Sequence, residues 1–258
     1  MALNPETITI VILAGLFCGF LNAVASSGSA VSLPVLMSVG LHAVAANATN
    51  RVPVLVGAMA ATVGLARRGA IPWKHTLETA GPITLGAAAG ALLSERIPGH
   101  DLRIVIVAAV TVALVLILTN LKKLLNASAN GTAKVDWKVM LLLFCVGVWT
   151  GFIVLDAGTY MLLVLVLVAD FALPEANALR NVATATATAL AMAIFARHES
   201  VDWTTGGIMA LGSVAGGLLG ARLAISNQAR RWIVGLLVVV IVGELLNLSI
   251  RYFAHLLY

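Results

Sequence analysis

Two polar clusters lie within stretches of the sequence that are otherwise apolar: Asn47-Ala48-Thr49-Asn50-Arg51 and Asn177-Ala178-Leu179-Arg180-Asn181. The second repeats the first at an offset of 130 residues (177 − 47 = 130), with asparagine and arginine exchanged at the last two positions. An arginine inside a bilayer costs roughly 3 kcal/mol or more, so it normally faces a cavity or a partner. We predict that the two clusters face each other and bind an anion. The residues predicted to contact it are Arg51, Arg180, Asn47, Asn50, Asn177 and Asn181.

An arginine near a helix end can instead extend its charged head to the membrane surface and act as an anchor. Arg51 lies about two turns into its predicted helix, so this alternative applies to it. An anchoring arginine needs no neighbouring amides, however, and amides accompany the arginine in both halves. The duplication therefore favours a shared binding site.

The composition excludes an ordinary soluble domain. Of the 258 residues, 60% are hydrophobic and only 10% are charged, and the mean hydropathy is +1.02. Soluble chains average about 25% charged residues. The net charge of +5 does not indicate nucleic-acid binding, because the basic residues lie in short loops between apolar runs, where they act as topology signals. The sequence predicts a polytopic helical membrane protein.

Six segments are suited to cross about 30 Å of hydrocarbon. They are residues 44–66, 76–94, 102–121, 176–196, 204–223 and 231–250. Two further apolar regions, 8–40 and 139–170, are too long for one span and too short for two. Polar and small residues interrupt both, at Ser26-Ser27-Gly28-Ser29 and at Asp156-Ala157-Gly158-Thr159, and Gly28 and Gly158 are again 130 residues apart. We expect each region to form a hairpin of two short helices.

The interruption of each hairpin is a candidate part of the anion site. Exposed backbone within a membrane is tolerated only where protein or water lines it, so each break should border a cavity. The helix that follows the break would aim its positive N-terminal end there. The candidate ligands at the breaks are Ser26, Ser27, Gly28, Ser29, Gly158 and Thr159. Asp156 either neutralises an arginine or binds the proton that couples transport.

The basic residues predict the orientation of the chain. With two hairpins, ten of them fall on one side of the membrane and four on the other, against nine and five if each hairpin were a single broken span. The positive-inside rule places the ten in the cytoplasm and both termini outside. This parity makes the halves inverted, as in many secondary transporters. The prediction is an all-α membrane protein with two inverted repeats, each a re-entrant helical hairpin followed by three transmembrane helices. The repeats are residues 1–121 and 139–258, joined by a cytoplasmic connector at 122–138.

Other positions repeat at the same offset and have a structural interpretation. Ile71-Pro72-Trp73 and Val201-Asp202-Trp203 both precede a predicted helix, and Val135-Asp136-Trp137 is a third such opening. Aspartate suits an N-cap position. The pairs Gly86/Gly90 and Gly216/Gly220 predict close helix contact.

Catalytic and cofactor chemistry finds little support. The five histidines lie at loops or segment ends without metal-ligand spacing, so we predict no metal site. No buried nucleophile is paired with a base, and no nucleotide-binding loop occurs. We therefore expect no enzyme activity and no cofactor. What remains is a cationic, hydrogen-bonding set of groups, which suits an oxyanion.

The duplicated break, the NATNR and NALRN clusters and the two tryptophan-containing openings resemble the sulfite exporter TauE/SafE family over about residues 8–250. Members often have a glycine-richer run at each break than this chain does. The resemblance implies a secondary transporter in the bacterial inner membrane that exports sulfite, sulfonates or related small organic anions by alternating access. An anion channel with the same site is the alternative, and a non-transporting scaffold would not need a duplicated polar core. The expected partners are a small anion and the lipid bilayer, without nucleic acid, and a homo-oligomer is compatible with the sequence.

Overall fold

Each helix of the first half has a counterpart about 130 residues later. The structure is a computed structural model that describes residues 4–94, 133–153, 157–198 and 201–226, with 115, 119, 120, 229, 231–236, 238, 239, 242 and 243. The first half contains α1 (Pro5–Ala25), α2 (Ser29–Ser38), α3 (Ala43–Ala66), the 3-10 turn η1 (Trp73–His75) and α4 (Thr76–Ser94). The second contains α7 (Trp137–Phe152), α8 (Ala157–Leu163), the π-helical η2 (Val164–Val168), α9 (Leu173–Phe195), the 3-10 turn η3 (Ala196–His198) and α10 (Trp203–Ala224). Adding 130 to the bounds of α3 gives 173–196, which is α9 to within one residue.

The described part of the chain is all helical, as the sequence predicts, and it contains no strand. Four of its helices, α1, α3, α9 and α10, are long and apolar enough to cross a membrane. The predicted segment at residues 76–94 forms α4. Most of the predicted span at 102–121, half of that at 231–250 and most of the connector lie outside the described residues.

Aspartate caps start two of the second-half helices, at the openings that the sequence predicts. The Asp136 side chain accepts a hydrogen bond from the backbone N–H of Val139 at 2.9 Å. The Asp202 side chain accepts one from the N–H of Thr205 at 3.0 Å. Each cap satisfies a backbone donor that the first helical turn leaves unpaired.

The first predicted break is present, since Ser26, Ser27 and Gly28 separate α1 from α2. At the second, Ala157, Gly158 and Thr159 lie inside α8, and Asp156 lies outside the described residues. The prediction of two short helices per hairpin is wrong for the first hairpin. α1 has 21 residues, which is about 31 Å at 1.5 Å per residue and enough to cross the hydrocarbon core. Its start at Pro5 is capped by Asn4, so the helix begins before the apolar run does. α2 has only 10 residues. Ser26 ends α1 in the left-handed region, with φ of 69°.

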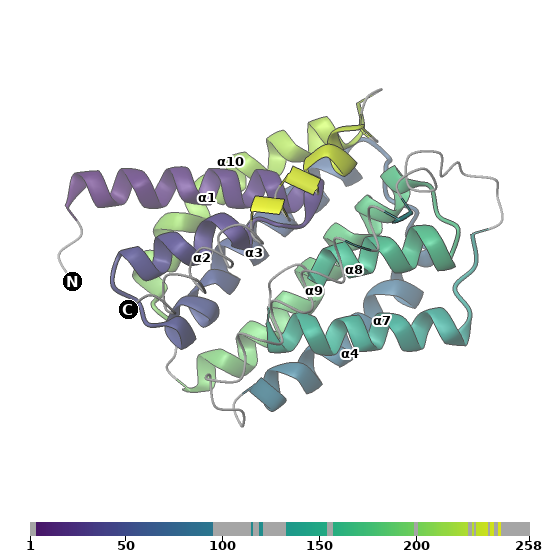
Figure 1. The fold of residues 1–258 in the computed structure, drawn as a ribbon, viewed down its shortest axis with the longest axis horizontal. Helices are drawn as coiled ribbons and strands as arrows, with labels where there is room; N and C mark the ends of the chain where they lie inside the picture. The colour runs from purple at the N-terminus through teal and green to yellow at the C-terminus, as the bar shows by residue number, and fades with distance from the viewer. Residues whose placement is uncertain are drawn as a thin grey trace.

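Glycines bring the first helix of each half against the last described helix of the other half. A Cβ at Gly15 or Gly19 of α1 would overlap the backbone carbonyl oxygen of Met209 or Ser213 in α10. In the same way, a Cβ at Gly86 or Gly90 of α4 would overlap a backbone carbonyl oxygen of α7. Figure 1 shows α1 beside α10 and α4 beside α7, with α3 and α9 between these pairs. A Cβ at Gly216 or Gly220 of α10 would likewise overlap atoms of α1, so the predicted close contacts at Gly86/Gly90 and Gly216/Gly220 are confirmed.

The central helices α3 and α9 run antiparallel. Ala48 and Val52, near the start of α3, share a buried cluster with Ala191 and Phe195, near the end of α9. At the other end, Leu65 of α3 clusters with residues of the first turns of α9. Two repeats of opposite orientation require such an arrangement of their equivalent helices.

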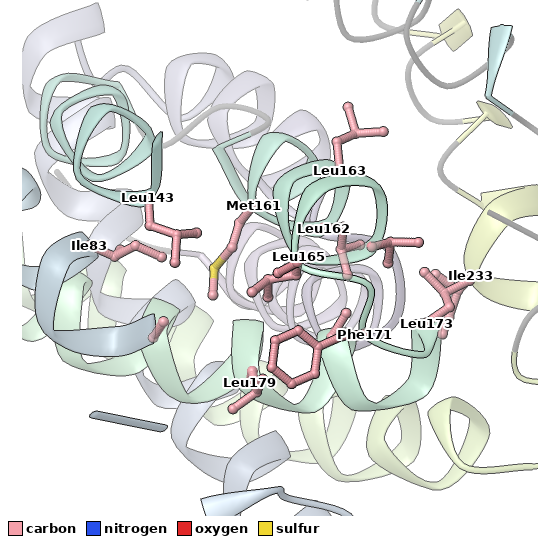
Figure 2. Packing of buried hydrophobic residues seen from close by; sticks show 14 of the residues in the cluster. Ile83, Leu143, Met161, Leu162, Leu163, Leu165, Phe171, Leu173, Leu179 and Ile233 are labelled. Carbon is pink, nitrogen blue, oxygen red and sulfur yellow. The ribbon is translucent and has the colours of Figure 1, made fainter. Parts of the chain in front are cut away.

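The largest buried apolar cluster holds the short helix α8 in place. Figure 2 shows Ile83 of α4 and Leu143 of α7 next to Met161 of α8. Leu165 of η2 and Phe171 lie in the same cluster and are almost fully buried. Van der Waals packing drives helix association within a membrane, so these close contacts give a helix this short a fixed position.

Candidate functional site

Arg180 of α9 binds the C-terminal end of α1. Its side chain is 1% exposed, and its Nη2 donates hydrogen bonds to the backbone carbonyl oxygens of Asn22 at 2.5 Å and Ala23 at 3.1 Å. These carbonyls belong to the last turn of α1, where the helix has no residues left to donate to them. The helix end also carries a partial negative charge of about half an electron, which attracts the guanidinium.

Arg51 of α3 does the same for α7. It is 0% exposed, and its Nη1 and Nη2 donate to the carbonyl oxygens of Thr150 at 3.3 Å and Gly151 at 2.6 Å. Its guanidinium also stacks over the ring of Phe195, 4.4 Å from the ring centre. Each arginine therefore caps the broken first helix of the opposite half. Neither arginine snorkels to the surface, because both are buried.

The asparagines of the two clusters hydrogen-bond to different helices. In α9, Asn177 and Asn181 donate from Nδ2 to the carbonyl oxygen of Ala23, at 3.0 and 3.2 Å, and so reinforce the contact of Arg180 with α1. In α3, Asn50 donates to the Ser29 hydroxyl at 2.9 Å and accepts from the Ser32 hydroxyl at 2.5 Å. Asn50 thereby holds the start of α2. Asn47 is half-buried.

A small cavity lies between the ends of α1 and α7. Its volume is about 20 Å³, which is room for about one or two water molecules. Ser26, which ends α1, and Gly158, in the first turn of α8, meet beside it: a Cβ at Gly158 would overlap the Ser26 hydroxyl oxygen and approach Cδ of Arg180 to 3.1 Å. The polar residues of the wall are Asn22, Ser26, Thr150, Arg180, Asn181, Thr184 and Thr188.

The structure brings some predicted site residues together and separates others from them. Arg180, Asn181, Ser26 and Gly158 all line the cavity. Arg51 does not line it, although its Nη1 donates to the carbonyl oxygen of Thr150, which does. Arg51 stacks on Phe195, which lies 15 residues (195 − 180 = 15) beyond Arg180, or about 22 Å along α9. The antiparallel pairing of α3 and α9 carries the two clusters toward opposite ends of the helix pair.

The remaining candidates lie away from the cavity wall. Asn47, Asn50 and Asn177 are on α3 and α9, as described above. Ser27, Gly28 and Ser29 belong to the first break, where Gly28 donates its N–H to Asn22 Oδ1 at 2.9 Å. Thr159 is buried in α8, and its hydroxyl has no hydrogen-bond partner among the described residues. Asp156 lies outside the described residues.

Sequence reasoning missed four polar residues of the wall: Asn22, Thr150, Thr184 and Thr188. The two threonines of α9 carry a signal that was available. Positions 177, 181, 184 and 188 follow the spacing of one helix face, so the face that begins with the two asparagines continues with two hydroxyls. The alternation of alanine and threonine over 183–188 hides this face.

The cavity is suited to a hydrogen-bond acceptor or an anion. Two of the residues that line it, Arg180 and Thr188, each carry a buried donor without a partner among the described residues: Nε of Arg180 and the Thr188 hydroxyl. In the same part of the chain neither arginine forms an ion pair with a carboxylate. A buried guanidinium without a counter-charge attracts an anion. No group of three or more potential metal ligands occurs in the residues that were placed.

The helices and this cavity define a helical membrane protein with a small internal cavity that a buried arginine lines. The chain belongs to the Sulfite exporter TauE/SafE family, whose sequence model matches residues 11–245. This confirms the resemblance noted in the sequence.

Curated relatives extend over nearly the whole chain. The chain is 24% identical over 253 residues to the "Probable membrane transporter protein YfcA" of Escherichia coli K12, covering 98% of this chain and 92% of that protein. It is 25% identical over 217 residues to "Probable membrane transporter protein ORF9" of Sinorhizobium sp, covering 84% and 83%. A "Probable membrane transporter protein" of Haemophilus influenzae is 25% identical over 229 residues, covering 88% and 89%. No solved structure matches the chain significantly.

Proposed function

We propose that this protein is a secondary transporter that exports a small sulfur oxyanion or organic anion by alternating access. The anion is held between the two halves, in an enlarged form of the cavity beside Arg180. The observation that carries this proposal is a buried guanidinium that lines the cavity, has an unused Nε–H donor and has no carboxylate partner in the described chain. The family, and the transporter names of the relatives, support the same class.

Three residues of the wall contact the anion in this proposal, and Arg51 acts from outside the wall. Arg180 supplies the charge, and its Nε–H points one donor at the anion. Asn181 and Ser26 supply neutral hydrogen-bonding groups. Arg51 holds the end of α7 and acts as a positioning residue, because it contacts Thr150, which lines the cavity, and does not line it itself.

The size of the cavity favours a carrier over a channel. About 20 Å³ holds a water molecule or two but not an oxyanion with its hydrogen-bond partners. Entry of the anion therefore requires the cavity to enlarge, and separation of Ser26 from Gly158, which are in close contact beside it, would achieve this. A carrier that alternates between open and closed forms includes such a step.

The proposal includes a location and an orientation. Opposite membrane orientation of the two halves agrees with the antiparallel α3 and α9. The protein then crosses the bacterial inner membrane several times, with both termini in the periplasm. It catalyses no chemical change in the anion.

Counterflow in proteoliposomes tests the proposal. Labelled sulfite is added outside vesicles that contain unlabelled sulfite, sulfate, sulfoacetate or a short carboxylate. A carrier takes up label faster when the transported anion is present inside. After it releases labelled sulfite inside, its binding site returns to the outside carrying an unlabelled anion and can then bind label again. A channel is indicated if the uptake rate does not depend on the internal anion and uptake stops once the sulfite gradient has dissipated. Absence of flux and of binding for every anion tested would refute an anion transporter.

A further inference from the structure

The cavity has one polar wall and one apolar wall. The side chains of α9 that line it are Arg180, Asn181, Thr184 and Thr188. Across from them, α3 contributes Val54 and Ala58, although it occupies the equivalent position in the other half. Subtracting 130 from 184 and 188 gives 54 and 58, so Val54 and Ala58 occupy in the first repeat the positions that Thr184 and Thr188 occupy in the second. The two hydroxyls therefore line the cavity together with their own apolar counterparts. The duplicated framework thus holds an asymmetric site.

Thr188 is a member of the polar wall whose hydroxyl is fully buried and has no partner among the described residues. The residue is 0% exposed, and its Oγ1 has no hydrogen-bond partner in the described chain. A threonine in a helix usually returns its hydroxyl to a carbonyl three or four residues earlier. Thr150 does so to Val146 at 2.8 Å, and Thr186 to Ala183 at 3.1 Å. Thr188 does not, and it lines the cavity.

We propose that Thr188 hydrogen-bonds a second polar group of the transported ion, remote from the anionic group at Arg180. This inference rests on the proposed function, since it names the class of ion that the same cavity takes. The ligand is then an organic anion with an anionic head, an apolar middle and a hydrogen-bond acceptor at the far end.

The spacing along α9 determines the shape of this ligand. Arg180 and Thr188 are eight residues apart (188 − 180 = 8), which places their Cα atoms about 12 Å apart along the helix. Two hydrogen bonds of about 3 Å each leave room for several bonded atoms between the two ligand groups. Ile83 and Met161, which Figure 2 shows close together, supply an apolar surface for that middle part. Sulfite alone cannot reach both residues.

Two alkanesulfonates of equal length test the proposal. Hydroxybutanesulfonate ends in a hydroxyl, and pentanesulfonate ends in a methyl group at the same position. The purified wild-type protein should bind the hydroxylated probe about tenfold more tightly, because one buried hydrogen bond contributes on this order. Thr188→Val keeps the shape of the side chain and removes the hydroxyl. It should abolish that preference by weakening hydroxybutanesulfonate binding about tenfold while leaving pentanesulfonate binding unchanged.

Matched variants separate recognition from folding. Thr186→Val makes the same change two residues earlier, on an exposed residue whose hydroxyl pairs with Thr84 at 2.8 Å, and should retain the preference. Thr188→Ser retains a hydroxyl at this position and should therefore retain the preference for hydroxybutanesulfonate. Equal binding of both probes by the wild type, or an equal loss of both in Thr188→Val, would overturn the role of Thr188. Failure of the wild type to bind any sulfonate, carboxylate or sulfite would instead refute the proposed function.

Discussion

Replacing each buried arginine with methionine should separate a structural arginine from a binding one. Arg51→Met removes two hydrogen bonds to α7 carbonyls and the stacking on Phe195. Hydrogen bonds from a charged donor contribute about 1.5–3 kcal/mol each, and a cation–π contact adds roughly 1 kcal/mol. Relief from burying the charge offsets several kcal/mol of this loss. We expect a net destabilisation of about 2–4 kcal/mol.

The assay measures stability and binding on the same purified protein. At about 2–4 °C per kcal/mol for a chain of this size, unfolding of Arg51→Met in detergent should occur roughly 5–15 °C lower. Below that temperature its affinity for the transported anion should stay within about threefold of the wild type, since Arg51 does not line the cavity. Arg180→Met should be destabilised to a similar degree and should also lose at least about 100-fold in affinity, because a charge-assisted contact is worth nearly 3 kcal/mol.

One result would refute this division of roles. If folded Arg51→Met loses affinity as severely as Arg180→Met, both guanidiniums contact the anion, as the sequence alone suggests. Lysine variants provide the control for charge. Arg51→Lys keeps a cation that can donate to the carbonyls of Thr150 and Gly151, and it should recover part of the lost stability.

Three further predictions address packing, orientation and coupling. Gly90→Ala should lower the unfolding temperature because its Cβ would overlap the Val148 carbonyl, whereas Gly81→Ala in the same helix meets nothing within 4 Å and should be neutral or slightly stabilising. An impermeant thiol reagent on intact cells should label a cysteine introduced at Tyr258 and not one at Asn130; the reverse pattern would contradict the proposed orientation. Asp156→Asn should retain anion exchange in proteoliposomes but lose its response to an imposed pH step, and an intact response would remove Asp156 from the coupling mechanism.

Much of the helical framework could be predicted because it repeats. The offset of 130 residues, the breaks and the aspartate caps identify the helices to within a few residues. The length of α1 was misjudged because the break at Ser26 was placed in the middle of the apolar region, whereas the helix begins at Pro5. In α1 the cap residue Asn4, ahead of the apolar run, marks the start of the helix and therefore its length.

The arrangement of the site was less predictable, for a physical reason. The partners of Arg51, Arg180 and Asn177 are backbone carbonyls, which every residue carries and which no sequence pattern marks. Similar clusters in two halves suggested a common centre. Antiparallel helices place them apart, and only the Arg180 cluster reaches the cavity.

The cross-capping of the two halves has a consequence for biogenesis. Arg180 is synthesised 158 residues after Asn22, whose carbonyl it binds. At about 5–20 residues per second, the end of α1 waits roughly 8–30 s for its cap. During that interval Arg51 also lacks Thr150 and Gly151, which follow it by 99 and 100 residues. The first half therefore enters the bilayer with a buried cation and open carbonyls. Expressed alone, it should be recognised by membrane quality-control proteases, and co-expression of the second half should protect it.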